Sequence, residues 1–211
     1  MHREIQVKNM GYSQNNEDEF VLEYFGGFKG TLLEIGANNG TDLSNSKLLI
    51  ENGWHAHLVE PGSSCADLFL RHSLNPNVHI YNFGIGDRDE KVKFWESGNH
   101  VPNGHDKGLV STADFEETKR WPHVEFTECE IELVKWDTFY NELRPTFHFI
   151  SIDAEGSDWT ILQQIDLQAV GCQVLCIEYN SKPELLNLFT NYCNGYRLAV
   201  QNMENLIFVT D

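Results

Sequence analysis

Short apolar runs alternate with amphipathic stretches along most of the chain. Five runs are nearly continuous in apolar residues, and each ends at a glycine or an acidic residue; they are residues 30–35, 54–59, 78–83, 147–152 and 174–177. Runs of this length and composition, bounded by turn-forming residues, indicate buried β-strands. The segments between them repeat their apolar residues at helical spacing. Helices are expected after Asp42 or Ser44, after Ser63 or Ser64, through Trp159 and Ile165, and from Pro183.

This alternation predicts an α/β fold with a mostly parallel sheet and helices on both faces. The last two apolar runs, 196–200 and 206–209, are joined by five polar or flexible residues and predict a closing hairpin. Residues 91–95 and 124–134 alternate like half-exposed strands, and the two can pair with each other. The polar stretch between them, 97–123, predicts an irregular insertion or lid.

Length and charge restrict the class of protein. The chain has 211 residues, which suits a single domain over 1–211. Its formal net charge of −17 disfavours nucleic acid and anionic membranes as partners and favours a cationic or neutral small ligand. No apolar leader and no run long enough to span a membrane is present. Five cysteines without CxxC spacing indicate reduced thiols, so a cytoplasmic protein is expected.

Candidate chemistry lies at the ends of the expected strands. Ligands of parallel sheets bind beyond the carboxyl ends of the strands. The residues that follow the apolar runs are therefore the first candidates: Gly36, Glu60, Asp87, Asp153 and Glu178.

The first of these strand ends carries a glycine loop, Gly36 to Gly40, and Glu60 follows it at the end of the next strand. A carboxylate in that position suits ribose hydroxyls. The loop differs from the dinucleotide fingerprint, because Asn38 stands where the middle glycine would be. Glu34 beside the loop would repel a pyrophosphate but attract an ammonium or sulfonium group. The charges therefore favour S-adenosyl-L-methionine over a nicotinamide dinucleotide.

Several motifs together give the chain a family resemblance. Residues 33–40 (LEIGANNG), 59–61 (VEP) and 149–156 (FISIDAEG) resemble the FkbM family of class I S-adenosylmethionine-dependent methyltransferases. Supporting matches are residues 12–14 with 17–18, 133–139, 178–180 and 205–209. The resemblance implies a Rossmann-like fold whose seven-stranded sheet is mostly parallel, with an antiparallel last strand. It also implies O-methylation of sugar or other small-molecule hydroxyls.

The resemblance also implies a set of cofactor-binding residues. Glu34, Gly36 and Asn38 would hold the methionine part of the cofactor, Glu60 the ribose, and residues 85–87 the adenine. The full expected set is Glu34, Gly36, Ala37, Asn38, Gly40, Glu60, Pro61, Ile85, Gly86 and Asp87.

Methyl transfer to an alcohol requires removal of its proton, so a general base or a metal is expected. By its position in the family motif, Asp153 would face the transfer centre, and it is the first candidate for the base. Glu155 is the second, although an acidic residue there can equally cap the next helix. His105, beside Asp106 in the insertion, is a third candidate or part of a solvated loop. A divalent cation shared by Asp153, Glu155 and Glu178 is an alternative that the sequence does not require.

The sequence thus predicts a methyltransferase that acts on a small-molecule or saccharide hydroxyl. Two alternatives remain at this point: a nicotinamide-dependent oxidoreductase and a module that binds the cofactor without catalysis. The identity of the acceptor and the oligomeric state are not encoded in any of these motifs.

Overall fold

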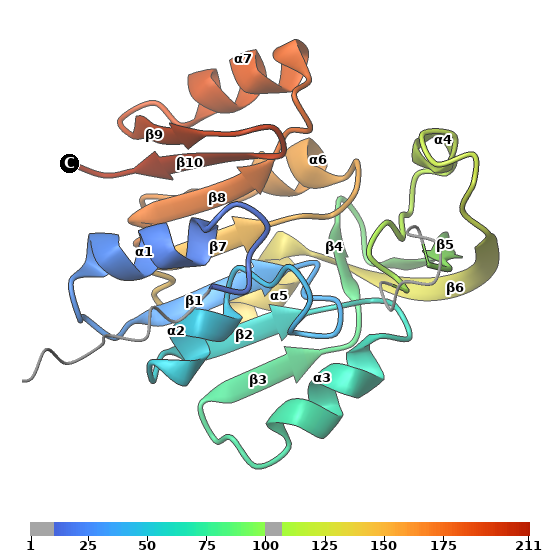
Figure 1. The fold of residues 1–211 in the computed structure, drawn as a ribbon, viewed down its shortest axis with the longest axis horizontal. Coiled ribbons are helices and arrows are strands. Elements are labelled where there is room, and N and C mark those ends of the chain that lie inside the picture. The colour runs from blue at the N-terminus through green and yellow to red at the C-terminus, as the bar shows by residue number, and fades with distance from the viewer. Residues whose placement is uncertain (1–10, 100–106) are drawn as a thin grey trace, which may run out of the picture.

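A seven-stranded sheet forms the centre of the protein (Figure 1). The computed structural model describes residues 11–99 and 107–211. In spatial order the strands are β3 (Val78–Tyr81), β2 (His55–Val59), β1 (Thr31–Ile35), β7 (Phe149–Ile152), β8 (Val174–Glu178), β10 (Asn205–Val209) and β9 (Arg197–Gln201). The first five are parallel, and β10 runs antiparallel to both β8 and β9. The Rossmann-like sheet and the terminal hairpin predicted from the sequence are confirmed.

Helices cover both faces of this sheet. The strands alternate their side chains between the two faces, so Leu33 and Leu32 enter different apolar clusters. One face packs on α1 (Glu17–Phe25), α2 (Lys47–Glu51) and α3 (Cys65–His72). The other packs on α5 (Trp136–Leu143), α6 (Asp158–Leu162) and α7 (Pro183–Tyr192). Because both faces are buried, the central strands need the continuous apolar runs seen in the sequence.

A second, smaller sheet projects from one side of the domain (Figure 1). It consists of β4 (Gly84–Gly86), β6 (Phe126–Lys135) and β5 (Glu90–Ser97), and β5 pairs antiparallel with β6 as the alternating patterns predict. The apolar run 78–83 predicts one strand that closes at residues 84–87, but residues 84–86 form a strand of their own. They form β4 because Leu133 packs directly over the two glycines, 2.8 Å from where a Cβ of Gly84 or Gly86 would lie.

Besides the short α4 in the insertion, two helices were not predicted from the sequence. The helix α1 begins after Asn16 and contains the buried carboxylates of Glu17 and Asp18, which the apolar pattern does not mark. The helix α5 follows β6 directly and buries Trp136 and Phe139. Both elements obtain their stability from tertiary contacts, which local periodicity does not report.

The described part of the insertion, residues 107–123, lies beside the carboxyl ends of the central strands. It contains α4 (Phe115–Thr118), and Thr112 forms a bridge to Trp95 of β5. Within residues 11–99 and 107–211, no helix is long and apolar enough to cross a membrane.

Candidate functional site

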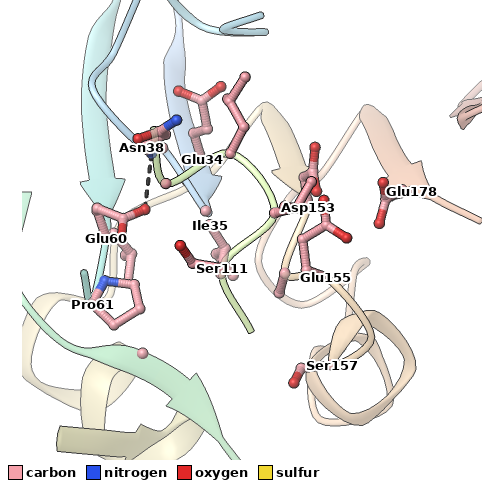
Figure 2. A pocket seen from close by; sticks show the side chains of 18 of the residues that line it. Glu34, Ile35, Asn38, Glu60, Pro61, Ser111, Asp153, Glu155, Ser157 and Glu178 are labelled. Carbon is pink, nitrogen blue, oxygen red and sulfur yellow. Dashed lines mark hydrogen bonds between the residues drawn. The ribbon is translucent and has the colours of Figure 1, made fainter. Parts of the chain in front are cut away.

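A cleft of about 250 Å³ opens at the carboxyl ends of β1, β2, β7 and β8 (Figure 2). Seven of the described residues that line it are acidic: Glu34, Asp42, Glu60, Asp153, Glu155, Glu178 and Glu204. None of the described lining residues is Lys, Arg or His. The cleft therefore presents a one-sided negative charge, which favours a cationic ligand and disfavours a phosphate.

The glycine loop after β1 is held close to two neighbouring strands. The backbone N–H groups of Gly36 and Ala37 both donate to the carbonyl of Val59, at 2.9 and 3.1 Å. Gly36 has a φ of 86°, and a Cβ there would lie 1.7 Å from the carbonyl oxygen of Asp153. Only glycine fits this position, for both reasons. The loop thus forms a tight cradle with exposed backbone.

Asn38, in the same loop, presents an unpaired amide to the cleft. Asn38 is only 7% exposed, yet neither its side-chain oxygen nor its side-chain nitrogen has a hydrogen-bond partner. Its φ of 45° places it in the left-handed region, where an asparagine is tolerated better than most residues. A buried amide without partners is costly in a folded protein, so its place on the cleft wall indicates that a ligand pairs with it.

Glu60, at the end of β2, is oriented by two backbone donors. Its oxygens accept from the N–H of Asn38 at 2.9 Å and from the N–H of Gly62 at 2.6 Å. Burial raises the pKa of Glu60, and these two hydrogen bonds oppose the rise. Ser64 also hydrogen-bonds to Glu60. A carboxylate has about four acceptor positions, so capacity remains for a hydroxyl group of a ligand.

Glu34 lies on the other side of the glycine loop. It is 4% exposed and accepts hydrogen bonds from the hydroxyls of Ser44 and Ser46 and from the N–H of Asn45, the last at 2.9 Å. Burial raises the pKa of Glu34 to about 7, although these donors favour the ionised form. Glu34 therefore both anchors the segment before α2 and adds charge to the cleft wall.

The end of the cleft nearest β4 is apolar. Pro61 and Ile85 line it together with three side chains of the small sheet, Phe94, Ile131 and Leu133. The slot lies next to the carboxylate of Glu60 and has the apolar lining that planar aromatic ligands prefer.

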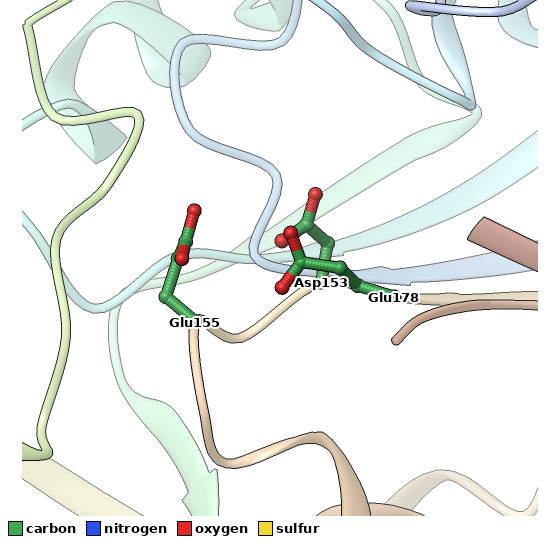
Figure 3. A group of neighbouring side chains, drawn as sticks. All are labelled: Asp153, Glu155 and Glu178. Atoms are coloured by element: carbon green, nitrogen blue, oxygen red, sulfur yellow. The ribbon is translucent and has the colours of Figure 1, made fainter. Parts of the chain in front are cut away.

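Three carboxylates gather at the opposite end of the cleft (Figure 3). Asp153 follows β7, Glu155 lies two residues later with a φ of 44°, and Glu178 ends β8. One oxygen atom from each of the three lies within 4.8 Å of the others. Burial, followed by the nearby charges of Asp158 and Glu34, raises the pKa of Asp153 to about 8. Burial also raises the pKa of both Glu155 and Glu178, and the Asp153 carboxyl raises them further.

The insertion closes one side of this acidic end. The Thr112 hydroxyl donates to the carbonyl of Glu155 at 2.7 Å. Glu117 pairs with Lys182 at 3.0 Å and with Arg120 at 2.6 Å, and Arg120 lies 3.8 Å from Glu155. Leu109, Val110, Ser111 and Trp121 of the insertion also line the cleft. The insertion is thus one wall of the site.

Most of the expected site residues meet in this single cleft. Its lining includes Glu34, Gly36, Ala37, Asn38, Glu60, Pro61, Ile85, Asp153 and Glu155. The described structure places three others off the cleft wall. A Cβ on Gly40 would meet Leu68, Gly86 packs against Leu133, and the Asp87 side chain is 60% exposed and lies 3.8 Å from Arg88. His105 lies outside the described residues.

Sequence reasoning missed several residues of the cleft. Asn45 and Asn205 are buried polar residues on its wall, and Trp121 and Ser111 come from the insertion. Asn205 lies in a stretch that matches the family, but it reaches the cleft through the pairing of β10 with β8, and Trp121 and Ser111 reach it through the folding back of the insertion.

The parallel sheet, the glycine cradle and the carboxylate at the end of β2 define a Rossmann-like α/β domain with an acidic cleft at its strand ends. The chain matches the model of the family described as "Methyltransferase FkbM domain" over residues 34–198, which is most of its length. It therefore belongs to the FkbM methyltransferase family, and the resemblance drawn from its motifs is confirmed.

Solved structures with a similar fold are also methyltransferases. The precorrin-6y C5,15-methyltransferase of Geobacter metallireducens GS-15 is 10% identical; the match covers 92% of this chain and 87% of that chain, with a TM-score of 0.47. The 1,6-didemethyltoxoflavin-N1-methyltransferase of Burkholderia thailandensis, solved with 1,6-didemethyltoxoflavin and S-adenosylhomocysteine, is 11% identical, with 93% and 78% covered and a TM-score of 0.47. No curated protein matches the chain.

Proposed function

We propose that the cleft binds S-adenosyl-L-methionine and that the protein methylates a hydroxyl group of a small molecule or saccharide. The observation that carries this proposal is the charge of the cleft wall, with seven carboxylates and no basic side chain among its described residues. A sulfonium cofactor with an ammonium group complements that wall, whereas the pyrophosphate of a nicotinamide dinucleotide would be repelled by it.

The residues present fit this cofactor. Glu60 keeps acceptor capacity for a ribose hydroxyl, and the apolar slot at Pro61 and Ile85 takes the adenine. Gly36 lets the backbone approach the methionine part, and Glu34 provides a carboxylate for its ammonium group. A polar ligand in the cleft would supply partners for the unpaired amide of Asn38.

When bound, S-adenosyl-L-methionine supplies an activated methyl group, whose transfer to the acceptor oxygen leaves the C–S electron pair on sulfur and requires the hydroxyl proton to go elsewhere. We assign that proton to Asp153, which faces the cleft beyond the glycine cradle; Glu155 is the second candidate, and His105 remains an expectation from the sequence. The carboxylates and the wall of the insertion hold the acceptor in line, and such positioning supplies much of the rate gain. Five free thiols, four of them buried, support a reducing, cytoplasmic location.

Isothermal titration calorimetry with the cofactor and its demethylated product tests the binding step. Glu60→Gln should weaken binding about 10- to 100-fold, because hydrogen bonds to a charged group contribute about 1.5–3 kcal/mol each. Glu132→Gln, an exposed site on β6, is the matched control and should bind normally. Absence of binding to the natural protein, or binding of reduced nicotinamide dinucleotide in its place, would refute the proposal.

The transfer step is tested with a panel of hydroxyl compounds and radiolabelled methyl donor. Asp153→Asn should lose nearly all product formation while it still binds the cofactor. Full activity of this variant would remove Asp153 from the role of proton acceptor, and loss of cofactor binding as well would show that it serves the cofactor and not the acceptor.

A further inference from the structure

We infer that Asp153, Glu155, Glu178 and Asn205 form a binding site for a hard divalent cation at the acceptor end of the cleft. The site itself stands on the geometry described below. Its part in the reaction, which is to bind the acceptor hydroxyl, rests on the proposed function.

The carboxylate geometry suits such a cation. The three carboxylates come from two adjacent strand ends, and one oxygen from each lies within 4.8 Å of the others (Figure 3). Oxygen ligands of Ca²⁺ lie at roughly 2.3–2.6 Å, so two ligands on opposite sides of the ion are roughly 4.6–5.2 Å apart. The cluster thus has the spread of one coordination sphere, and a modest contraction would suit the shorter bonds of Mn²⁺ or Mg²⁺.

Asn205 supplies an independent observation. It is 5% exposed, lines the same cleft, and its Oδ1 has no hydrogen-bond partner. In the β8–β10 register it lies directly opposite Glu178, so the two side chains stand on the same face of the sheet. Its Nδ2 donates to Glu17 at 2.9 Å, which turns the oxygen away from Glu17. An amide oxygen left unpaired beside carboxylates is a suitable ligand for a hard cation.

The basic side chains near the cluster do not take the place of a cation. Arg120 and Lys182 are both paired with Glu117, and Arg120 comes no closer to Glu155 than 3.8 Å. Within the described part of the chain, no Lys or Arg forms an ion pair with Asp153 or Glu178. Three crowded carboxylates with only Arg120 as a basic neighbour among the described residues still repel one another, and a divalent ion relieves that repulsion.

The proposed site is compatible with the proton transfer assigned to Asp153. Each carboxylate needs only one oxygen for the ion, so the second oxygen of Asp153 can accept the proton of the acceptor hydroxyl. A hydroxyl coordinated to the ion has a lowered pKa and gives up its proton more readily.

The test is a titration of the cofactor-free protein with Mn²⁺, followed by electron paramagnetic resonance in salt of about 150 mM to screen surface charges. One site should appear, and Mg²⁺ or Ca²⁺ should compete for it. Glu178→Gln and Glu155→Gln should each weaken Mn²⁺ binding at least 10-fold. The exposed pair Glu128→Gln with Glu130→Gln on β6 is the control and should leave the affinity unchanged.

Two further variants separate ligation from structure and from cofactor binding. Asn205→Asp keeps the oxygen but loses the donor to Glu17, so it should bind Mn²⁺ as tightly as the natural protein or more tightly, whereas Asn205→Ala should bind it several-fold more weakly. Glu60→Gln should weaken cofactor binding by the factor given above and keep its affinity for Mn²⁺. The cation site would be overturned if Glu178→Gln bound Mn²⁺ as tightly as the natural protein. It would also be overturned if the β6 control lost as much Mn²⁺ affinity as Glu178→Gln. If the natural protein did not bind the cofactor at all but still bound Mn²⁺, the proposed function would be refuted and the cation site would stand.

Discussion

Several residues of the cleft hold the fold together and also face the space where a ligand would bind. Gly36 is fixed by the carbonyl of Asp153, and Asn38 gives its backbone N–H to Glu60 while its side-chain amide stays unpaired. Glu34 is the clearest case, because its burial opposes the negative charge that a cationic ligand requires. Such a conflict is typical of a binding site, where stability is lowered for the benefit of a ligand.

The protonation of Glu34 gives a prediction about pH. Burial raises its pKa to about 7, so in the cofactor-free protein the carboxyl is largely protonated at pH 6. Affinity for S-adenosyl-L-methionine should therefore increase as the pH rises from about 5.5 to about 7.5, because the ionised carboxylate attracts the ammonium group. Calorimetry across this range measures the effect, and Glu34→Gln should bind more weakly and lose most of the pH dependence. An unchanged slope in the variant would assign the dependence to another group.

The raised pKa of Glu34 affects the stability of the fold in the opposite direction to its effect on cofactor affinity. The pKa of Glu34 is higher in the folded protein, about 7, than its ordinary value of 4.5. Its contribution to stability is therefore fully present below pH 4.5 and is lost as the pH rises through about 7. The cofactor-free protein thus loses the contribution of Glu34 to stability over the range in which it gains affinity.

At the scale of elements, the insertion is attached to the strand ends by specific polar contacts. The Thr112 hydroxyl, 1% exposed, donates to the carbonyl of Glu155, and the Glu117–Lys182 pair joins α4 to the segment before α7. These contacts connect the small sheet to the acidic end of the cleft. They place Ser111 and Trp121 in the wall of the site.

Replacement of Thr112 by Val tests the strength of this attachment. The change keeps the side-chain shape but leaves the Glu155 carbonyl without its donor, so the free energy of unfolding should fall by about 1–3 kcal/mol. Urea unfolding measures it. Thr118→Val is the matched control: its hydroxyl also donates to a backbone carbonyl at 2.7 Å, but in an exposed position, and the loss should be below about 0.5 kcal/mol. Equal losses in the two variants would show that Thr112 does not hold the insertion.

For the whole molecule, the dominant feature is the excess of negative charge. The chain carries 32 acidic and 15 basic residues, and acidic groups gather in the cleft as well as on the exposed strands of the small sheet. Self-repulsion of this size lowers the stability of a compact state, and dissolved salt screens it.

The melting temperature should therefore rise when NaCl increases from about 10 mM to about 150 mM at pH 7.5. For a domain of this size, each kcal/mol gained corresponds to roughly 2–4 °C. Differential scanning calorimetry measures the shift. Near the pI of about 4.8 the net charge vanishes, and the same salt range should have little effect. A melting temperature that falls with salt at pH 7.5 would mean that the ion pairs of the surface outweigh the repulsion.

The sequence by itself determined the order of the central strands along the chain, four of the helices that follow them, and the position of the chemistry at strand ends. This was possible because both faces of the central strands are buried, so each strand appears as an apolar run, and because the turn after a parallel strand begins at a fixed place. Glu34 lies within such a run, and Gly36, Glu60 and Asp153 directly follow one, so all four could be identified from the runs.

Tertiary structure alone decided which polar groups face one another. Asn205 lies 27 residues after Glu178 in the chain but opposite it in the sheet, and Thr112 reaches Glu155 through an insertion without periodicity. Gly40, Gly86 and Asp87 are close in sequence to cleft residues, yet neighbouring side chains or solvent occupy their surroundings. Local patterns report burial and turns, whereas contacts between distant residues depend on strand pairing and packing, which no local pattern contains.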